Sequence, residues 1–331
     1  TVSLVPGETV ASYYYGNAGV YSGGVLDLNG GTLDLDYYGV FRTVDAGVVI
    51  MDDPNSRIIA GSGDFAGGVS TLTAGTIQLG NSFTQSGTAN AFDASGSHTV
   101  VFGTTAAYGA IAFGTPGAAS GTSHFANLRF DGSSSITLNS TVFVNGTLSV
   151  DDNIGSLSVY GNAYRLEVGG VNIPGVSTQV RFVRAPLRVG ASGPLVLNNA
   201  VFESFTATEY EDQLAVTRNG GTFTLDGLHF TTACANTWNY VVAIAGTSAP
   251  TLNFTNLTWP GTCTNKVALV GGAVVNGFTA PPAFDRVWTG TVSSSWNDPA
   301  NWDGAVPTST SNVRIPGGTT NQPVITSSVA T

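Results

Sequence analysis

Lysine is nearly missing from this chain of 331 residues, in which Lys266 is the one example. Charged residues of all kinds make up 10% of the sequence, against about 25% in ordinary globular proteins. Asp and Glu outnumber Lys and Arg by 21 to 11, which gives a net charge of −10. Because nucleic-acid binding depends on clustered Lys and Arg facing the phosphates, this composition argues against a nucleic-acid partner. It argues equally against binding to anionic membranes.

Long apolar runs and sustained helical periodicity are also missing. No apolar run approaches the roughly 18 residues that cross a bilayer as a helix, so the sequence predicts no membrane span. It is not a disordered composition either, because 42% of the residues are hydrophobic and short strand-like runs are well marked.

Cysteine is scarce, with only Cys234 and Cys263, both in stretches rich in Thr, Asn and Gly. The low-Lys, Thr/Asn/Gly-rich composition indicates a location outside the cytoplasm, where disulfides persist. We therefore expect the two cysteines to form one disulfide, with two unpaired thiols as the alternative. CxxC spacing is absent and His229 is the one histidine near either cysteine, which disfavours a metal site.

Short alternating runs are what the sequence has in abundance. Apolar and polar residues alternate at 25–28, 32–35, 76–79, 99–102, 136–138, 142–144 and 148–150, and Gly, Asn or Asp separates the runs. Thr, Val, Tyr and Phe suit half-buried pleated surfaces, and Gly and Asn suit tight turns. The pattern predicts an almost entirely β fold.

Two sets of internal echoes suggest a repeat. In the first set, residues 123–130, 224–230 and 253–259 align, with Leu228 and Leu257 29 positions apart, and a weaker copy at 197–202 places Val201 27 positions before Leu228. In the second set, a Gly-Gly, Ala-Gly or Asn-Gly pair precedes Thr-apolar-x-apolar at 30–35, 74–79, 145–150 and 220–225. A unit of this length cannot bury its own apolar side, whereas stacking units in register buries a continuous core.

The sequence therefore predicts a parallel β-solenoid, right-handed because parallel crossovers prefer that hand. The residues expected to point inward are Leu26, Leu28, Leu33, Leu35, Phe125, Leu128, Phe130, Leu225, Leu228, Phe230, Phe254, Leu257 and Trp259. The alternative is a chain of tandem β-sandwich domains, which would show longer strands and turn signals every 8–12 residues or so.

The residue composition and pattern of the sequence change after the Pro-Pro pair at 281–282. Trp288, Trp296 and Trp302 fall within fifteen residues, and residues 312–316 and 323–326 look like the first strands of a fresh coil. Three such large side chains together predict a packed aromatic cluster or a binding surface. We expect a solenoid body over 1–280 and a separate Trp-rich segment over 281–331, which starts a new solenoid unit or docks on a neighbouring subunit.

With these residues in view, the chain resembles the long, repetitive extracellular β-helix proteins of bacteria, of the surface-adhesin or autotransporter-passenger type. Residues 287–326 resemble the Trp-rich unit that opens new solenoid segments there, and residues 81–106 and 121–150 resemble the repetitive body. The Cys-containing stretch 230–265 departs from that body. The resemblance implies a β-helix fold at the cell surface and implies no particular activity.

Candidate chemistry is weak, and we expect no enzyme. The carboxylates group as Asp27/Asp34/Asp36, Asp52/Asp53, Asp151/Asp152 and Glu203/Glu209/Glu211/Asp212, which solvated turns explain better than the paired carboxylates of a glycosidase. Arg181, Arg184 and Arg188 alternate with apolar residues, as on an outward strand face. No cofactor is expected, although calcium could bind the oxygens of Asp151, Asp152 and Asn153 or of residues 209–212. The histidines His98, His124 and His229 are scattered and suggest no shared ligand role.

The leading functional hypothesis is an extracellular or cell-surface structural protein that partners copies of itself. An open solenoid end exposes unpaired backbone and apolar core. The last residues read on into the first as continuous β sequence, so we expect a head-to-tail junction by strand addition. That junction would join Val324 and Ile325 to Val2, Leu4, Tyr13, Tyr14 and Tyr15 of the next copy. The alternatives are an adhesin that stacks glycans on exposed aromatics, such as the Tyr residues at 13–15 and 37–38 or the Trp cluster, and a polysaccharide lyase or hydrolase.

Overall fold

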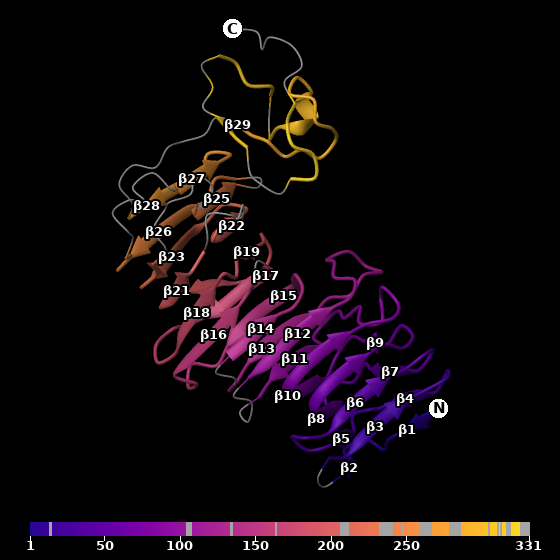
Figure 1. The fold of residues 1–331 in the computed structure, drawn as a ribbon. Coiled ribbons are helices and arrows are strands. Elements are labelled where there is room, and N and C mark those ends of the chain that lie inside the picture. The colour runs from indigo at the N-terminus through magenta and orange to yellow at the C-terminus, as the bar shows by residue number, and fades with distance from the viewer. Residues whose placement is uncertain are drawn as a thin grey trace. The chain divides into compact units, whose positions relative to one another are not determined.

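The chain's fold is that of a computed structural model (Figure 1). The residues that it describes are 1–12, 15–103, 108–132, 135–162, 164–205, 212–231, 241–245, 248–258, 267–277, 286–303, 305–309, 311, 313–315 and 319–324. Apart from one 3-10 turn at Pro299–Asn301, the elements of these residues are all strands. The stacked parallel strands form a β-solenoid of about ten turns, which confirms the expected fold class over tandem sandwiches.

The chain divides into two units, residues 1–185 with 192–200 and residues 186–191 with 201–331. Each turn of the first unit passes through three parallel faces, which we name A, B and C. Face A contains β2 (Thr9–Ala11), β5 (Thr32–Asp34), β11 (Thr99–Phe102), β13 (Asn127–Phe130) and β20 (Leu195–Leu197). Face B contains β3 (Asn17–Val20), β6 (Val40–Thr43), β12 (Gly109–Phe113), β14 (Ser135–Leu138), β16 (Ser156–Tyr160) and β18 (Gln179–Val183). Face C begins with β1 (Val2–Ser3), β4 (Val25–Asp27), β7 (Val48–Met51) and β9 (Thr71–Leu72).

Four longer strands turn a corner and serve two faces each. β8 (Arg57–Phe65) and β10 (Thr76–Gln85) run from face A into face B, and β15 (Val142–Val150) and β17 (Leu166–Ile173) run from face C into face A. At the corner within β8, a Cβ on Gly61 would lie 2.0 Å from the carbonyl oxygen of Tyr37. Only glycine allows the stacked turns to approach this closely.

The register of face A explains the repeated Thr-apolar-x-apolar motif. Leu33, Ile58, Ile77, Val100, Leu128, Leu148, Val171 and Leu195 pair in succession and form one column. One turn ranges from 19 residues (Ile58 to Ile77) to 28 (Val100 to Leu128). The echoes at 30–35, 74–79 and 145–150 therefore do occupy the same place in successive turns. From Leu33 to Leu195 each of these aliphatic side chains is buried, which stabilises the fold by about 1.5–3 kcal/mol each.

Phenylalanine side chains fill the core between faces B and C. Phe83 is 1% exposed, and its ring centroid lies 4.8–5.6 Å from those of Phe65, Phe92, Phe113 and Phe125. These rings come from several successive turns and meet in tilted, edge-on and stacked arrangements that aromatic pairs favour. The turns are therefore tied together by side-chain packing as well as by the backbone ladders.

The second unit repeats the three-faced plan. One ladder joins β19 (Leu187–Val189), β22 (Leu214–Arg218), β25 (Val241–Ala245) and β27 (Val267–Val270). Another joins β23 (Thr222–Asp226), β26 (Thr251–Thr255) and β28 (Val274–Asn276), and a third pairs β21 (Ala200–Glu203) with β24 (His229–Phe230). The rings of Phe202 and Phe230 stack at 5.0 Å. Figure 1 shows these strands in colours that run from salmon at β19 to orange at β28.

Most of the predicted inward residues are buried. Those confirmed are Leu28, Leu33, Leu35, Phe125, Leu128, Phe130, Leu225, Leu228, Phe230 and Phe254. Leu26 and Leu257 are only half-buried, so for these two the prediction was too strong. Leu26 pairs with Val2 of the outermost described strand on face C. The Val2 side chain is itself 63% exposed, so it covers Leu26 only in part. Trp259 lies outside the described residues.

The predicted repeat offsets are also largely confirmed. Leu225 pairs with Phe254 and His229 pairs with Thr258, both at the expected spacing of 29. Val201 pairs with His229 and not with Leu228, so the weaker copy was placed one residue out of register. The expected boundary between body and Trp-rich segment at 280–281 falls within 278–285, outside the described residues.

Candidate functional site

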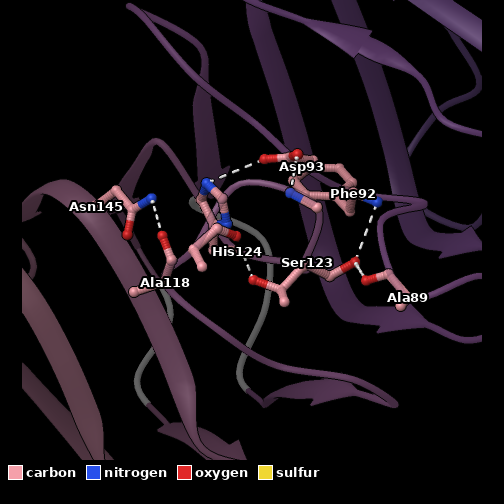
Figure 2. A network of polar contacts seen from close by, with 10 residues as sticks. Ala89, Phe92, Asp93, Ala118, Ser123, His124 and Asn145 are labelled. Atoms are coloured by element: carbon pink, nitrogen blue, oxygen red, sulfur yellow. Dashed lines mark hydrogen bonds and ion pairs between the residues drawn. The ribbon is translucent and has the colours of Figure 1, made fainter.

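A hollow with a volume of about 470 Å³ lies on face C of the first unit. Asp93, His124 and Asn145 lie on three successive turns, and all three line it (Figure 2). A parallel bridge pairs Asp93 with His124, and a second pairs Phe125 with Val144, which continues face C into β15. Sequence reasoning missed this site because 31 positions separate Asp93 from His124.

Asp93 and His124 form the one close acid–base pair of the hollow. The Nε2 atom of His124 lies 3.4 Å from Oδ1 of Asp93, and the side chains are 3% and 21% exposed respectively. The other oxygen of Asp93, Oδ2, accepts a hydrogen bond from the backbone N–H of Gly121 at 2.7 Å. Asp93 therefore fastens the loop before His124 to the previous turn, while His124 Nδ1 is buried without a hydrogen-bond partner among the described residues.

Ser123 is adjacent to this pair in sequence but does not complete a catalytic triad. Its hydroxyl donates to the carbonyl oxygen of Ala89 at 2.9 Å and accepts from the backbone N–H of Phe92 at 3.2 Å (Figure 2). Successive side chains of an extended strand point to opposite faces, so Ser123 and His124 diverge. The hydroxyl serves to hold the turn and is not presented to the hollow, where a nucleophile would have to lie.

Asn145 holds the far side of the same loop. Its Nδ2 donates to the carbonyl oxygen of Ala118 at 3.0 Å, so the loop is tied to the turns on both sides (Figure 2). The side chains that line the hollow include no Lys or Arg. What the geometry supports is a polar hollow with one carboxylate and one imidazole, and among the described residues no hydroxyl is hydrogen-bonded to that imidazole.

The carboxylates of the predicted Asp151/Asp152 cluster accept hydrogen bonds from loop residues. Asp151 Oδ1 accepts from the backbone N–H and from Nδ2 of Asn153, and Asp152 Oδ1 accepts from the backbone N–H groups of Ser177 and Thr178 in the next turn. No group of three or more His, Cys, Asp or Glu side chains that could hold a metal ion occurs in the described part of the chain. Glu209 and Glu211 lie outside that part.

The basic residues and the remaining histidines also have local explanations. Arg181 and Arg188 occupy half-exposed positions that alternate with the buried Val180, Phe182 and Val189, as expected of an outward strand face. His229 is half-buried in β24. His98 is fully buried beside Phe92, with ring centroids 5.7 Å apart. No described helix is long and apolar enough to cross a membrane.

His98 gives the chain a pH-dependent stability. Burial lowers the pKa of His98 from 6.5 to about 3, so it is neutral in the folded protein. Between these values the unfolded chain binds a proton that the folded chain does not, and the free energy of unfolding falls as pH falls through this window. Since the slope reaches about 1.36 kcal/mol per pH unit only well below 6.5, lowering the pH from 7.5 to 4.5 should cost about 2.7 kcal/mol.

The measurement compares urea unfolding of the wild type and His98→Leu at pH 7.5 and 4.5. Other groups titrate in both proteins, so the difference between the two pH dependences isolates His98. We expect the wild type to lose about 2–3 kcal/mol more than the variant on acidification. Equal losses in both proteins would show that His98 is not buried in neutral form.

The three tryptophans of the C-terminal segment pack against one another. Trp288, Trp296 and Trp302 are 0%, 9% and 5% exposed, with ring centroids 4.7–6.5 Å apart. The Nε1 atom of Trp288 donates to the carbonyl oxygen of Asn321, and that of Trp302 donates to the carbonyl oxygen of Trp296. The cluster is therefore the core of the described residues between 286 and 324, and its burial among them leaves no open face for stacking sugars.

Asn301 explains how so small a segment is held in shape. It is fully buried, and its Oδ1 accepts from the backbone N–H groups of Val292 and Ser293. Its Nδ2 donates to Ser293 Oγ and to the carbonyl oxygen of Ser295. One amide thus uses both its acceptor and its donor capacity, as buried polar groups must. The segment also contains the short parallel pair of β29 (Arg286–Val287) and β30 (Val313–Arg314).

The predicted junction and disulfide residues are only partly described. Val2 and Val324 are 63% and 50% exposed, Leu4 is half-buried and Tyr15 is 67% exposed. Within its own chain Val324 forms a parallel bridge with Ser295. Tyr13, Tyr14, Ile325, Cys234 and Cys263 all lie outside the described residues, so the disulfide stays a prediction.

Comparison with known proteins adds no identity. No protein-family model matches this chain, and neither a curated protein nor a solved structure matches it. The parallel β-solenoid expected from the resemblance to bacterial β-helix repeat proteins is confirmed by the fold.

Proposed function

We propose that this protein is an extracellular structural β-solenoid, a subunit or segment of a filament or surface stalk that assembles head-to-tail by β-strand addition. The observation that carries the proposal is the outer edge of the first described turn. β1, β2 and β3 each pair with a later strand on one side, and no described strand pairs with their other side. Such an edge is a template for a further strand.

The side chains of this edge support the same conclusion. Val10 pairs with Leu33 and so occupies the inward column of face A, yet it is 42% exposed. Val2 and Val5 are 63% and 65% exposed. A second copy that added one turn here would cover these apolar groups and satisfy the backbone together, which is how one solenoid turn stabilises the next.

The other side of the junction would come from the Trp-rich segment. Val287, at its start, is buried in a cluster with Ala215, Ala268 and Val270, so this segment covers β27 of its own chain. The half-exposed Val324 and the adjacent Ile325 then supply the strand that meets Val2 and Leu4 of the next copy, and the added turn that contains this strand also covers the edge of β2. Because the two surfaces differ, the contact is heterologous and generates an open filament.

The remaining parts of the proposal follow from composition. A chain with one lysine, few charges and many Thr, Asn and Gly suits an extracellular location. We propose no catalytic activity, since among the described residues no hydroxyl is hydrogen-bonded to the imidazole of the Asp93–His124 pair. The hydrogen bond that Asp93 accepts from the backbone N–H of Gly121 supports a role for the pair in holding the loop before His124.

A proline substitution tests the edge without disturbing the fold. The backbone N–H of Ser12 donates to the carbonyl oxygen of Asp34, so by alternation the N–H of Val10 points to β5 and that of Ala11 points outward. Ala11→Pro therefore removes only an outward donor, at an exposed edge position that tolerates proline. We expect it to reduce self-association at least tenfold in sedimentation velocity, with unchanged urea unfolding.

Two variants control this experiment. Ala11→Ser keeps the outward N–H and should associate like the wild type, while Val10→Pro removes an inward ladder bond and should destabilise the first turn. A wild-type chain that stays monomeric up to millimolar concentration would refute assembly from copies of itself. Association that survives Ala11→Pro would show that the contact lies elsewhere.

A further inference from the structure

A second, smaller hollow lies on the outer side of face A, where the turn after β5 passes along β8 and β10. Its volume is about 200 Å³. Asp34, Ile59 and Gln78 pair in register, so their outward side chains form one row along its length. Asp36 and Tyr37, from the turn that follows β5, form the adjoining wall. The hollow is thus built from three successive turns of the solenoid.

The glycine at the corner of β10 determines where Tyr37 lies. A Cβ on Gly80 would be 2.6 Å from the Tyr37 ring, so the ring lies directly against this backbone. Its hydroxyl reaches Asn81, to which it donates a hydrogen bond of 3.2 Å. The ring is therefore fixed across two turns before any ligand arrives, which lowers the entropic cost of binding.

Two further tyrosines extend this aromatic wall. The ring centroid of Tyr38 lies 4.7 Å from that of Tyr37, and that of Tyr15 lies 5.2 Å from that of Tyr38. Tyr38 and Tyr15 are 51% and 67% exposed. Three tyrosine rings in successive contact, two of them open to solvent, provide an extended amphipathic surface next to the hollow.

The polar groups of the hollow have capacity left for a ligand. Oδ1 of Asp34 and Oδ1 of Asp36 accept the backbone N–H groups of Asp36 and Tyr37, which fixes both carboxylates in place. Oε1 of Gln78 accepts from Arg57. Among the described residues no hydrogen bond engages the two Oδ2 atoms or Nε2 of Gln78. The hollow therefore offers two fixed carboxylate acceptors and one amide donor beside an aromatic ring.

We propose that this hollow binds one ring of a neutral oligosaccharide, with the following rings lying against Tyr38 and Tyr15. A sugar ring has hydroxyl donors for the two carboxylates, an oxygen acceptor for Gln78 and an apolar face for Tyr37. The volume of about 200 Å³ is below the roughly 300–1,000 Å³ of drug-sized sites, which matches one ring of a longer chain. The carboxylates and the net charge of −10 disfavour uronic acids.

A cationic ligand is the main competing occupant, since carboxylates and aromatic rings also attract ammonium groups. Two features favour the sugar. The amide donor of Gln78 would face a cation unfavourably. Only Tyr37 of the three tyrosines lines the hollow, so their rings do not surround one point as the rings of an aromatic cage do. The proposal concerns the side of the solenoid and does not depend on assembly at its ends.

The test measures binding of the full chain by calorimetry to cellohexaose, xylohexaose and mannohexaose, with hexagalacturonate and acetylcholine as the acidic and cationic comparisons. We expect at least one neutral hexasaccharide to bind. Tyr38→Ala should weaken that binding about tenfold or more. Asp36→Asn should also weaken it, because an amide keeps the turn acceptor at this positive-φ position but loses the charge.

Tyr160→Ala is the matched control, because Tyr160 is a 40%-exposed tyrosine on face B away from the hollow, and it should leave binding unchanged. Failure of all three neutral hexasaccharides to bind would overturn the proposal. So would binding that Tyr38→Ala and Asp36→Asn leave intact, or a stronger response to acetylcholine or hexagalacturonate than to any neutral sugar.

Discussion

Phe83→Ala is expected to lower the free energy of unfolding of the first unit by about 3–5 kcal/mol, as removal of a buried aromatic ring does in other cores. Phe83 is 1% exposed and contacts four other phenylalanine rings from neighbouring turns. The stacked backbone ladders on both sides resist collapse into the space that the ring leaves. The cavity term therefore adds to the lost burial.

Urea unfolding followed by circular dichroism measures this loss. Val176→Ala is the matched control, since Val176 lies in the same unit but is 82% exposed, and it should change stability by less than about 0.5 kcal/mol. Because stability in a solenoid is shared between neighbouring turns, the variant should also gain a separate early transition. A loss below about 1 kcal/mol would mean that the turns are coupled by their ladders and not by this aromatic core.

The core was largely predictable because short strands with regular spacing leave few alternatives. The Thr-apolar-x-apolar echoes at 30–35, 74–79 and 145–150 identified face A, since each of them places its first apolar residue in the same buried column. The copy at 220–225 instead lies in β23 of the second unit. The spacing of 29 between Leu228 and Leu257 gave the register of the second unit, where Leu225 pairs with Phe254. The weaker copy at Val201 was placed one residue out because turns differ in length, and a single extra corner residue moves the register.

The two hollows were not predictable from the sequence, again because the turns differ in length. Asp93 and His124 meet only because the bridge between their turns has a particular register, and the turn that joins them carries an extra loop fixed by Gly121. Periodicity in the sequence does not report such insertions. In the sequence, Asp34 and Asp36 stand out only as carboxylates and Tyr37 only as one of an aromatic pair. Their common hollow depends on Gly80, whose missing side chain gives the ring its place.

The packing of the tryptophans shows how far residue type predicts structure. Three tryptophans in fifteen residues predicted either a packed cluster or a binding surface, and burial decides for the packed cluster. The sequence could not decide, because both outcomes require the same residues. The decisive partners are Asn301 and Asn321, which satisfy the backbone and the indole of Trp288.

Trp288→Ala is expected to unfold the C-terminal segment while the solenoid stays folded. Trp288 is fully buried, stacks at 6.5 Å on Trp296 and meets Trp302 edge-on at 5.1 Å. Its removal should cost about 3–5 kcal/mol, and a unit of some 40 residues has little stability to lose. Hydrogen exchange should show lost protection over 286–303 and unchanged protection in β13 and β15.

Val292→Ala provides the control, because Val292 belongs to the same segment but is 61% exposed and should leave its protection unchanged. Protection that persists in Trp288→Ala would mean that the tryptophan cluster is not what folds the segment.

The same variant tests the two sides of the proposed junction separately. If Val324 and Ile325 supply the added strand, Trp288→Ala should abolish self-association as Ala11→Pro does. It should do so although the N-terminal edge of the Trp288→Ala chain is unchanged. An equimolar mixture of the two variants should then form dimers that cannot extend, because Ala11→Pro retains the donor segment and Trp288→Ala retains the acceptor edge.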